Sequence, residues 1–369
     1  MEVMALHSGC SQSNSVRLER SEMSHRSGCL CKLPACSLED LLQNSFALAF
    51  GGGGPPHPMH RPEDCAIVEF GEKCLLMTTD LGPLVGVDLR AAGRIAALHA
   101  MSDIHACGGV PKWSLVTLIA KHGSPEDYME CVMAGVLQAS SEEGVAVLGG
   151  HTIVGEEAMV GLTVLGVPRS GLVLRKSSAE TGDRILLSKS LGVGIIVRAY
   201  KLGLASDAEL EEAVALMTTS NGLASEQAVK AGVHSATDVT GFGLLGHLIE
   251  MLQPGQGAVL EVDRIPLLKP ARRLAEQMYH TCWTEGNLDY VESYRKMTGI
   301  RDLPRILPLL DPQTNGGLLV AAGDTATEAL RKHGFHPIGR ITESDSVELC
   351  GQTTVSERDR RRSTRGVRS

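Results

Sequence analysis

The sequence predicts two mixed α+β domains of similar size rather than a single doubly wound sheet. Segments with strand and helix patterns follow one another without strict βαβ alternation. A polar, glycine-containing stretch at residues 168–171 divides the patterned part of the chain. With 369 residues and 43% hydrophobic content, the chain can build two cores. We place the first domain at residues 61–168 and the second at residues 169–350.

Residues 1–60 are predicted to form a mobile arm. The first 36 residues are polar, serine-rich and non-periodic. A short helix should follow at Ser37, where Asp40 completes a capping box. Gly51–Gly54 and the two prolines after them form a hinge that would let the arm swing over the body.

The arm contains the segment Ser24–Lys32, which reads SHRSGCLCK and lacks the periodicity of a core element. A lysine close to a cysteine lowers the thiol pKa and favours the reactive thiolate. The two thiols of this segment, Cys29 and Cys31, are therefore candidates for nucleophile chemistry beside Lys32. An N-terminal tail with incidental cysteines explains these nine residues equally well.

The first domain should contain four strands and two helices. Apolar residues recur at helical spacing through Ile95, Leu98, Met101 and Ile104. The strands are predicted at Cys74–Asp80, Ser114–Ala120, Val145–Leu148 and Met159–Val167, and the helices at Asp88–Ala106 and from a Ser124 cap to about Glu143.

The second domain mixes strands and helices in the same way. Strands are predicted at Arg184–Ser188, Ala258–Val262 and Gly317–Ala321, and helices at Ile195–Leu202, Asp207 to about Lys230, Gly243–Leu252, Pro270–Tyr279 and Thr325–Lys332. Residues 351–369 are basic and non-periodic, and we expect them to be disordered.

Composition excludes several classes of protein. Only 3% of residues are aromatic and the net charge is −8, which argues against a nucleic-acid partner. No apolar run approaches the roughly 20 residues of a membrane span. The ten cysteines are scattered and no signal peptide is evident, so we expect a reducing, cytoplasmic setting.

Four aspartates are candidate site residues by position. Asp64 opens the body, Asp80 ends a predicted strand, and Asp238 lies in the segment SATDVTGFGLLGH. Asp103 interrupts the apolar stripe of a helix, where an acid is costly unless it is paired or binds a metal. Carboxylates of this kind suit Mg²⁺ together with substrate phosphates.

Two glycine clusters also need interpretation. Gly149–Thr152 (GGHT) directly after a strand would let backbone N–H groups approach a phosphate, although a plain tight turn is equally compatible. Gly241–Gly246 spells GxGxxG, with Asp263 further on, but the residues at 237–240 are too polar for the buried parallel strand of a dinucleotide site. No Walker A motif is present, so an ATP site must be built differently.

Taken together, the motifs resemble those of the selenophosphate synthetases (selenide, water dikinases), which belong to the aminoimidazole ribonucleotide synthetase-like superfamily. The resemblance runs from about Ser24 to Val347. In chain order it rests on SHRSGCLCK, DCAIV, TTD, GRIAALHAMSDIHACGG, GGHT, TDVTGFGLLGHL and DPQTNGGLL.

This resemblance implies two α/β domains, an ATP cleft, and a homodimer whose N-terminal domains close a β-barrel. It implies the conversion of ATP, selenide and water to selenophosphate, AMP and phosphate. Cys29 would be the catalytic cysteine and Lys32 a lysine that contacts the phosphates, while Asp64, Asp103 and Asp238 would bind Mg²⁺. The implied nucleotide contacts are Lys32, Arg61, Pro62, Glu63, Asp80, Asp103, Gly150, His151 and Thr152.

Two departures from the family pattern affect the expected site. Leu30 replaces the usual glycine between the two cysteines, which removes backbone freedom where the arm must bend. Pro62 removes an N–H donor next to the predicted nucleotide contacts. A related ATP-dependent kinase, a nucleotide-binding homologue without selenide activity, and a dehydrogenase that uses the GxGxxG string are the alternatives.

Overall fold

The computed structural model describes residues 63–351, except Glu72 and residues 282–283, together with helical positions at 41, 44, 45 and 48. These four positions agree with the predicted helix after Ser37. The rest of the predicted arm, including Cys29, Lys32 and the glycine hinge, and the predicted C-terminal tail lie outside the described residues. Within the described part of the chain, no helix has the length and apolar character needed to cross a membrane.

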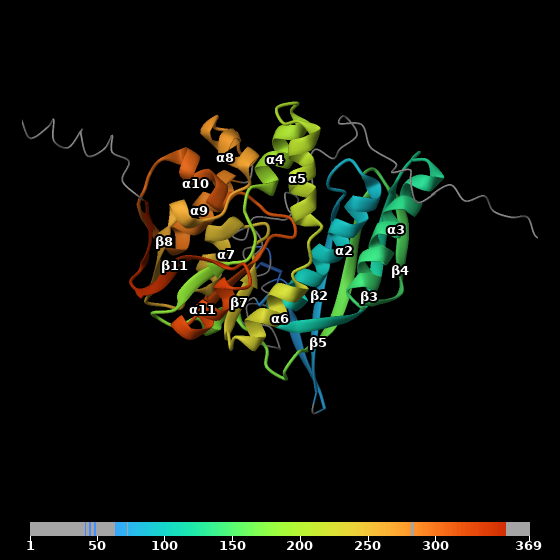
Figure 1. Cartoon of the computed structure of the whole chain (residues 1–369). Helices are drawn as coiled ribbons and strands as arrows, with labels where there is room; N and C mark the ends of the chain where they lie inside the picture. The colour runs from blue at the N-terminus through green and yellow to red at the C-terminus, as the bar shows by residue number, and fades with distance from the viewer. Residues whose placement is uncertain are drawn as a thin grey trace, which may run out of the picture.

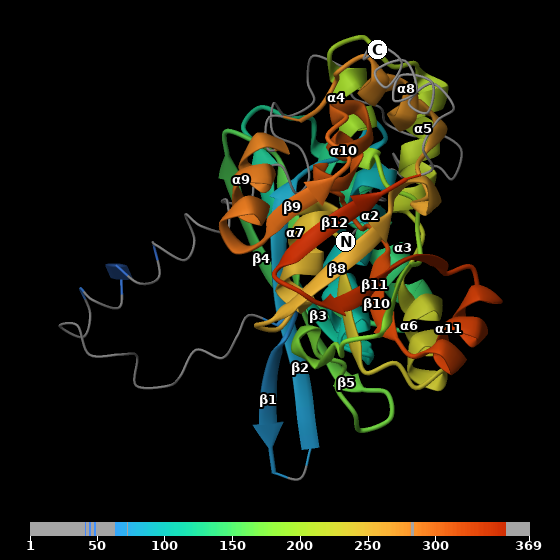
Figure 2. The same cartoon turned by 90° about the vertical axis from the view of Figure 1, so that its left-hand side faces the viewer.

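The described residues form a mixed α/β structure with two sheets, one from each half of the chain (Figure 1). The first sheet has the order β1-β2-β5-β3-β4. Its strands are β1 (Ala66–Phe70), β2 (Lys73–Pro83), β3 (Gly109–Lys121), β4 (Ala146–Gly155) and β5 (Met159–Pro168). Only β3 and β4 pair in parallel, and the β1–β2 hairpin projects from the body (Figure 2).

Two helices cover one face of this sheet, namely α2 (Leu89–Ala106) and α3 (Glu126–Glu142). Asp88 caps α2 by accepting a hydrogen bond from the Ala91 N–H at 2.7 Å, as expected for an N-cap aspartate. The two helices can pack closely because Gly93 has no side chain. A Cβ at this position would lie 1.9 Å from the Val132 carbonyl oxygen. The predicted apolar stripe of α2 is confirmed as buried core.

The second sheet has seven strands in the order β7-β10-β6-β11-β8-β12-β9. The strands are β6 (Arg184–Leu187), β7 (Ser235–Asp238), β8 (Gln256–Glu261), β9 (Lys296–Gly299), β10 (Leu318–Ala322), β11 (His336–Glu343) and β12 (Ser346–Cys350). The helices around it are α4 (Val193–Lys201), α5 (Asp207–Met217), α6 (Gly222–Lys230), α7 (Gly243–Met251), α8 (Lys269–Glu276), α9 (Thr284–Tyr294), α10 (Leu303–Leu310) and α11 (Asp324–Arg331). A 3-10 turn, η3 (Lys176–Ser178), precedes this half, and η4 (Val262–Arg264) follows β8.

Several predicted boundaries are wrong. β2 continues to Pro83, so Asp80 lies inside the strand rather than at its end. β4 continues to Gly155, so Gly149–Thr152 are strand residues and form neither a turn nor a phosphate loop after the strand. The helix expected from Asp207 to Lys230 is divided into α5 and α6, and α3 begins after Pro125 without a side-chain cap from Ser124.

Candidate active site

Three aspartates from distant parts of the sequence meet where the two halves contact each other. Asp64 precedes β1, Asp103 lies in the C-terminal part of α2, and Asp238 is the last residue of β7. One carboxylate oxygen from each lies within 4.8 Å of the other two. The structure therefore brings together all three aspartates that the sequence analysis selected as metal ligands.

Hydroxyl groups orient these three carboxylates. Thr78 donates from Oγ1 to Asp103 Oδ2 at 2.5 Å, and Ser102 donates to Asp238 Oδ2 at 2.6 Å. Thr237 donates to Asp64 Oδ1 at 3.0 Å. Each carboxylate thus has a fixed direction, which is a requirement for a preorganised metal site.

A buried lysine, Lys176 of η3, also contacts this cluster. Its Nζ lies 2.8 Å from Asp64 Oδ1 and 2.9 Å from Glu250 Oε2. Burial acts to lower the pKa of Lys176, but Asp64 and Glu250 outweigh burial and hold the pKa well above its usual value of 10.5. Burial likewise acts to raise the pKa of Glu250, but Lys176 and His247 bring it down to about 2. Both side chains are therefore charged at neutral pH.

The cluster has the chemistry of a site for a hard divalent cation. Burial raises the pKa of Asp64 to about 6, with Lys176 opposing this shift and the nearby charge of Asp238 adding to it. Asp238 itself is only 1% exposed. Buried carboxylates at this spacing repel one another and are stabilised by a cation, and a set of oxygen ligands alone suits Mg²⁺. The three aspartates thus fit the metal that the sequence predicted.

Asp80 lies on the α2 side of β2, close to the aspartate cluster. Its Oδ2 is 3.9 Å from His99 Nε2, and His99 Nδ1 accepts a hydrogen bond from the Asn315 N–H at 3.2 Å. Asn315 belongs to the DPQTNGG segment and has a φ of 49°, a left-handed conformation that asparagine tolerates better than most residues. This segment therefore contacts His99, the side chain that faces the predicted nucleotide contact Asp80.

A second buried lysine lies beneath the same segment. Lys189 Nζ donates to the carbonyl oxygens of Thr219 and Asn315 at 2.7 and 3.0 Å. Burial lowers the pKa of Lys189 to about 7, and the charge of Asp238 opposes this shift. Asn221 donates to Ser102 Oγ at 2.9 Å, which gives Ser102 a second partner in the second half besides Asp238.

The other predicted nucleotide contacts that the structure describes lie in two different places. Glu63 binds η3, since its carboxylate accepts hydrogen bonds from the Lys176 N–H at 2.9 Å and from Ser177 Oγ at 3.3 Å. Gly150–Thr152 lie exposed on β4, three strand spacings from β2, or about 14 Å across the sheet. Within one chain they are therefore separated from Asp80. Arg61 and Pro62, like Cys29 and Lys32, lie outside the described residues.

The residues before the GxGxxG string do not form the parallel strand of a dinucleotide site, as predicted, although Thr237 and Asp238 lie in a short buried strand, β7. All four residues of β7 are buried, because Thr237 and Asp238 pair with side chains of the first half. β7 is an edge strand that pairs with β10 in antiparallel orientation. A dinucleotide fingerprint needs a parallel strand at this point, so the string begins α7 without forming such a site.

Sequence reasoning missed Lys176, Glu250 and Lys189. Lys176 lies 112 positions from Asp64 and 74 from Glu250, so no local spacing could connect them. Lys176 lies outside every predicted helix and strand, five positions after the polar stretch at residues 168–171. Its burial at 6% exposure became evident only from the folded chain.

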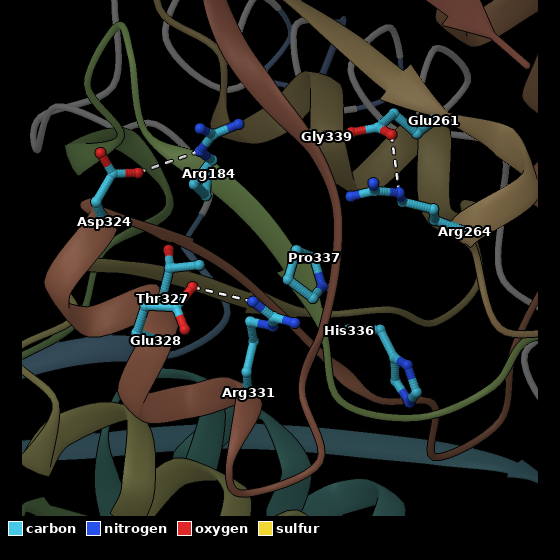
Figure 3. Close-up of a pocket in the computed structure, with 10 residues that line it drawn as sticks. All are labelled: Arg184, Glu261, Arg264, Asp324, Thr327, Glu328, Arg331, His336, Pro337 and Gly339. Carbon is cyan, nitrogen blue, oxygen red and sulfur yellow. Dashed lines mark hydrogen bonds and ion pairs between the residues drawn. The ribbon is translucent and has the colours of Figure 1, made fainter.

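A separate pocket of about 740 Å³ lies on the second half, between α11 and η4 (Figure 3). Its three arginines each face a carboxylate in the ion pairs Arg184–Asp324, Arg264–Glu261 and Arg331–Glu328. None of the three clustered aspartates lines it. The candidate active site is therefore the aspartate cluster and not this pocket.

Family comparison agrees with the two halves of the chain. Residues 62–168 match the family AIR synthase related protein, N-terminal domain, and residues 180–350 match the corresponding C-terminal domain family.

Curated relatives extend the similarity over most of the chain. The selenide, water dikinase of Shewanella sp. (strain MR-4) is 33% identical over 357 residues, which cover 93% of this chain and 99% of the relative. The enzyme of the same name from Geobacter metallireducens is 35% identical over 303 residues, which cover 79% and 86%. That of Carboxydothermus hydrogenoformans is 33% identical over 271 residues, which cover 73% and 79%.

Solved structures share the fold at lower identity. A chain of the HypE–HypF complex has a TM-score of 0.64 at 18% identity, covering 85% of this chain and 96% of that chain. AaThiL complexed with AMPPCP and TMP has a TM-score of 0.61 at 21% identity, covering 86% and 93%.

Proposed function

The chain belongs to the selenide, water dikinase family, and we propose that Asp64, Asp103 and Asp238 bind the magnesium ions of an ATP-dependent selenophosphate synthetase. The reaction converts ATP, selenide and water to selenophosphate, AMP and phosphate. The observation that carries the proposal is the convergence of three carboxylates, all within 4.8 Å, from residues up to 174 positions apart.

The chain's own residues provide orientation and charge at this site. Thr78, Ser102 and Thr237 direct the carboxylates through hydrogen bonds. Bound Mg²⁺ would neutralise triphosphate charge, which is the main electrostatic requirement of phosphoryl transfer. Asp80, fixed on the same side of β2 as Thr78, is proposed to contact the nucleotide, as are Asp103, Glu63 and Gly150–Thr152 and, outside the described residues, Lys32, Arg61 and Pro62.

Cys29 and Lys32 are proposed to provide the catalytic thiolate and a contact to the phosphates. A thiolate on an arm that closes over the cleft could handle selenium and exclude water from a reactive selenide. The five cysteines reported within the described residues, Cys65, Cys74, Cys107, Cys131 and Cys350, are all free thiols, which supports the proposed reducing, cytoplasmic setting.

A homodimer is proposed through the face of the first sheet that α2 and α3 leave uncovered. Apolar side chains are exposed on four of its five strands, which suggests a partner surface. They are Val68 and Phe70 on β1, Met77 and Leu81 on β2, Trp113 and Leu115 on β3, and Leu148 and Ile153 on β4. Closure of a barrel between two such sheets would bury this surface.

Product analysis tests the reaction directly. The protein is incubated with ATP, selenide and Mg²⁺, and the products are followed by phosphorus NMR and nucleotide chromatography. We expect selenophosphate and AMP from the wild type and neither from Cys29→Ser. Cys74→Ser, which removes a free thiol of β2, is the matched control and should remain active.

Other outcomes would identify the alternative functions. ADP as the end product would indicate a kinase related to the same superfamily. Nucleotide binding without turnover would indicate a homologue that lacks selenide activity. Full selenophosphate synthesis by Cys29→Ser would remove Cys29 from the proposed mechanism.

A further inference from the structure

Lys176 contacts the aspartate cluster through both its side chain and its backbone turn. Its ammonium group bridges Asp64 and Glu250 at 2.8 and 2.9 Å. The N–H of the same residue donates to Glu63 Oε2 at 2.9 Å, and Ser177 Oγ donates to Glu63 Oε1 at 3.3 Å. One short turn therefore fixes two consecutive residues, Glu63 and Asp64, at the start of the body.

The turn itself is attached to the second half of the chain. Ser235 of β7 donates from Oγ to the Lys176 carbonyl oxygen at 2.9 Å, and Gln253 donates from Nε2 to the Ser177 carbonyl oxygen at 2.8 Å. Lys176 is only 6% exposed. Since both ends of the lysine are held by rigid elements, its ammonium group has a defined position relative to β7 and α7.

Charge explains why a lysine is useful at this position. Asp64 faces two other aspartates within 4.8 Å on one side and Glu250 across Lys176 on the other. Without a cation between them, Asp64 and Glu250 would repel each other at low local dielectric, and Asp64 could rotate out of the cluster. The Lys176 ammonium and Thr237 Oγ1 instead hold Asp64 Oδ1 from one side.

We propose that Lys176 is a positioning residue of the metal site, a built-in counter-cation that keeps Asp64 directed toward Asp103 and Asp238. It touches neither nucleotide nor selenide in this role and acts through Asp64. The inference rests on the proposed function in one respect, because it takes the three aspartates as metal ligands.

Metal binding without turnover tests this role. Mn²⁺ affinity is measured by electron paramagnetic resonance and calorimetry at pH 8, where the carboxylates are ionised. Substitutions of groups that orient metal ligands typically weaken metal binding about 10- to 100-fold, and we expect a loss of this size for Lys176→Met. Lys230→Met removes an exposed lysine that pairs with Glu226, and it should bind Mn²⁺ like the wild type.

A charge-specific rescue separates positioning from mere packing. Lys176→Ala leaves a cavity between Asp64 and Glu250, so n-propylammonium should restore Mn²⁺ affinity while n-propanol of the same size should not. This second variant also gives an answer if Lys176→Met does not fold. Equal rescue by both compounds would mean that Lys176 only fills space and would overturn the proposal.

The outcomes distinguish this proposal from the proposed function. If Asp103→Asn abolishes Mn²⁺ binding but Lys176→Met binds as well as the wild type or more tightly, the metal site stands and the role of Lys176 is refuted. If Asp103→Asn leaves Mn²⁺ binding unchanged, the aspartate cluster is not the metal site and both proposals fail.

Discussion

Replacing Asp103 with asparagine should stabilise the metal-free protein while removing most of its stabilisation by magnesium. Two charged carboxylates whose oxygens lie within 4.8 Å of each other repel by at least about 3.5 kcal/mol at an effective dielectric constant of about 20. Asp103 faces two such neighbours, and Lys176 offsets part of the repulsion. Asparagine retains an oxygen that can accept the Thr78 hydrogen bond. We therefore expect the free energy of unfolding in EDTA to rise by about 2 kcal/mol.

Saturating Mg²⁺ should reverse this order of stability, so that the wild type becomes more stable than Asp103→Asn. A ligand at 100 times its dissociation constant stabilises the folded state by about 2.7 kcal/mol. The wild type should gain this amount, whereas Asp103→Asn, which lacks one charged ligand, should gain little. Urea unfolding followed by circular dichroism, with EDTA or with saturating Mg²⁺, measures both quantities in one design.

A matched buried aspartate controls for loss of a structural acid. Asp183 accepts a hydrogen bond from the Glu180 N–H at 2.9 Å and lies 3.1 Å from His234 Nε2, outside the cluster. Asp183→Asn should lose about 1–3 kcal/mol and keep the full stabilisation by magnesium. If Asp103→Asn behaved like Asp183→Asn, Asp103 would be a structural acid bonded to Thr78, and the electrostatic argument would be wrong.

Two further predictions concern pH and assembly. Because burial raises the pKa of Asp64 to about 6, calorimetry should show Mn²⁺ affinity rising from pH 5 to pH 7 and then levelling. The folded state binds the Asp64 proton more tightly than the unfolded chain does. In EDTA, the contribution of Asp64 to the free energy of unfolding should therefore fall as pH rises from about 4 to about 6. Asp64→Asn should remove this trend. Leu115→Asp on the exposed face of the first sheet should shift sedimentation equilibrium from dimer to monomer, whereas Leu223→Asp, at an exposed position of α6, should not. A dimeric Leu115→Asp protein would exclude this face as the interface.

Position in the predicted elements singled out four aspartates, and the resemblance to the selenophosphate synthetases selected Asp64, Asp103 and Asp238 among them as metal ligands. Asp103 interrupts the buried stripe of α2, and an unpaired acid there would be costly. The stripe from Ile95 to Ile104 likewise follows from helical periodicity. Local pattern is therefore enough where burial and periodicity belong to the same element.

Residues whose role depends on distant partners could not be predicted. Residues 237–240 looked too polar for a buried parallel strand, yet Thr237 and Asp238 are buried in the antiparallel strand β7, where Asp64 and Ser102, more than 130 positions away, are their hydrogen-bond partners. β4 continues through Gly149 and Gly150 after a register shift at Leu148, whereas the sequence predicted a phosphate-binding loop or a tight turn there. Here the backbone pairing of β3 with β4 overrides local propensity, and this pairing is a tertiary contact.

The hydrogen bonds around the cluster also explain why its acids come from both halves of the chain. Thr78–Asp103 lies within the first half, but Thr237–Asp64 and Ser102–Asp238 each join the first half to the second. Lys176, in the turn between the two sheets, adds a third connection by bridging Asp64 and Glu250 of α7. A cation bound by the three aspartates would therefore stabilise the contact between the halves, and any motion that separates them would dismantle the site. Binding of metal and docking of the two halves are, on this geometry, thermodynamically linked.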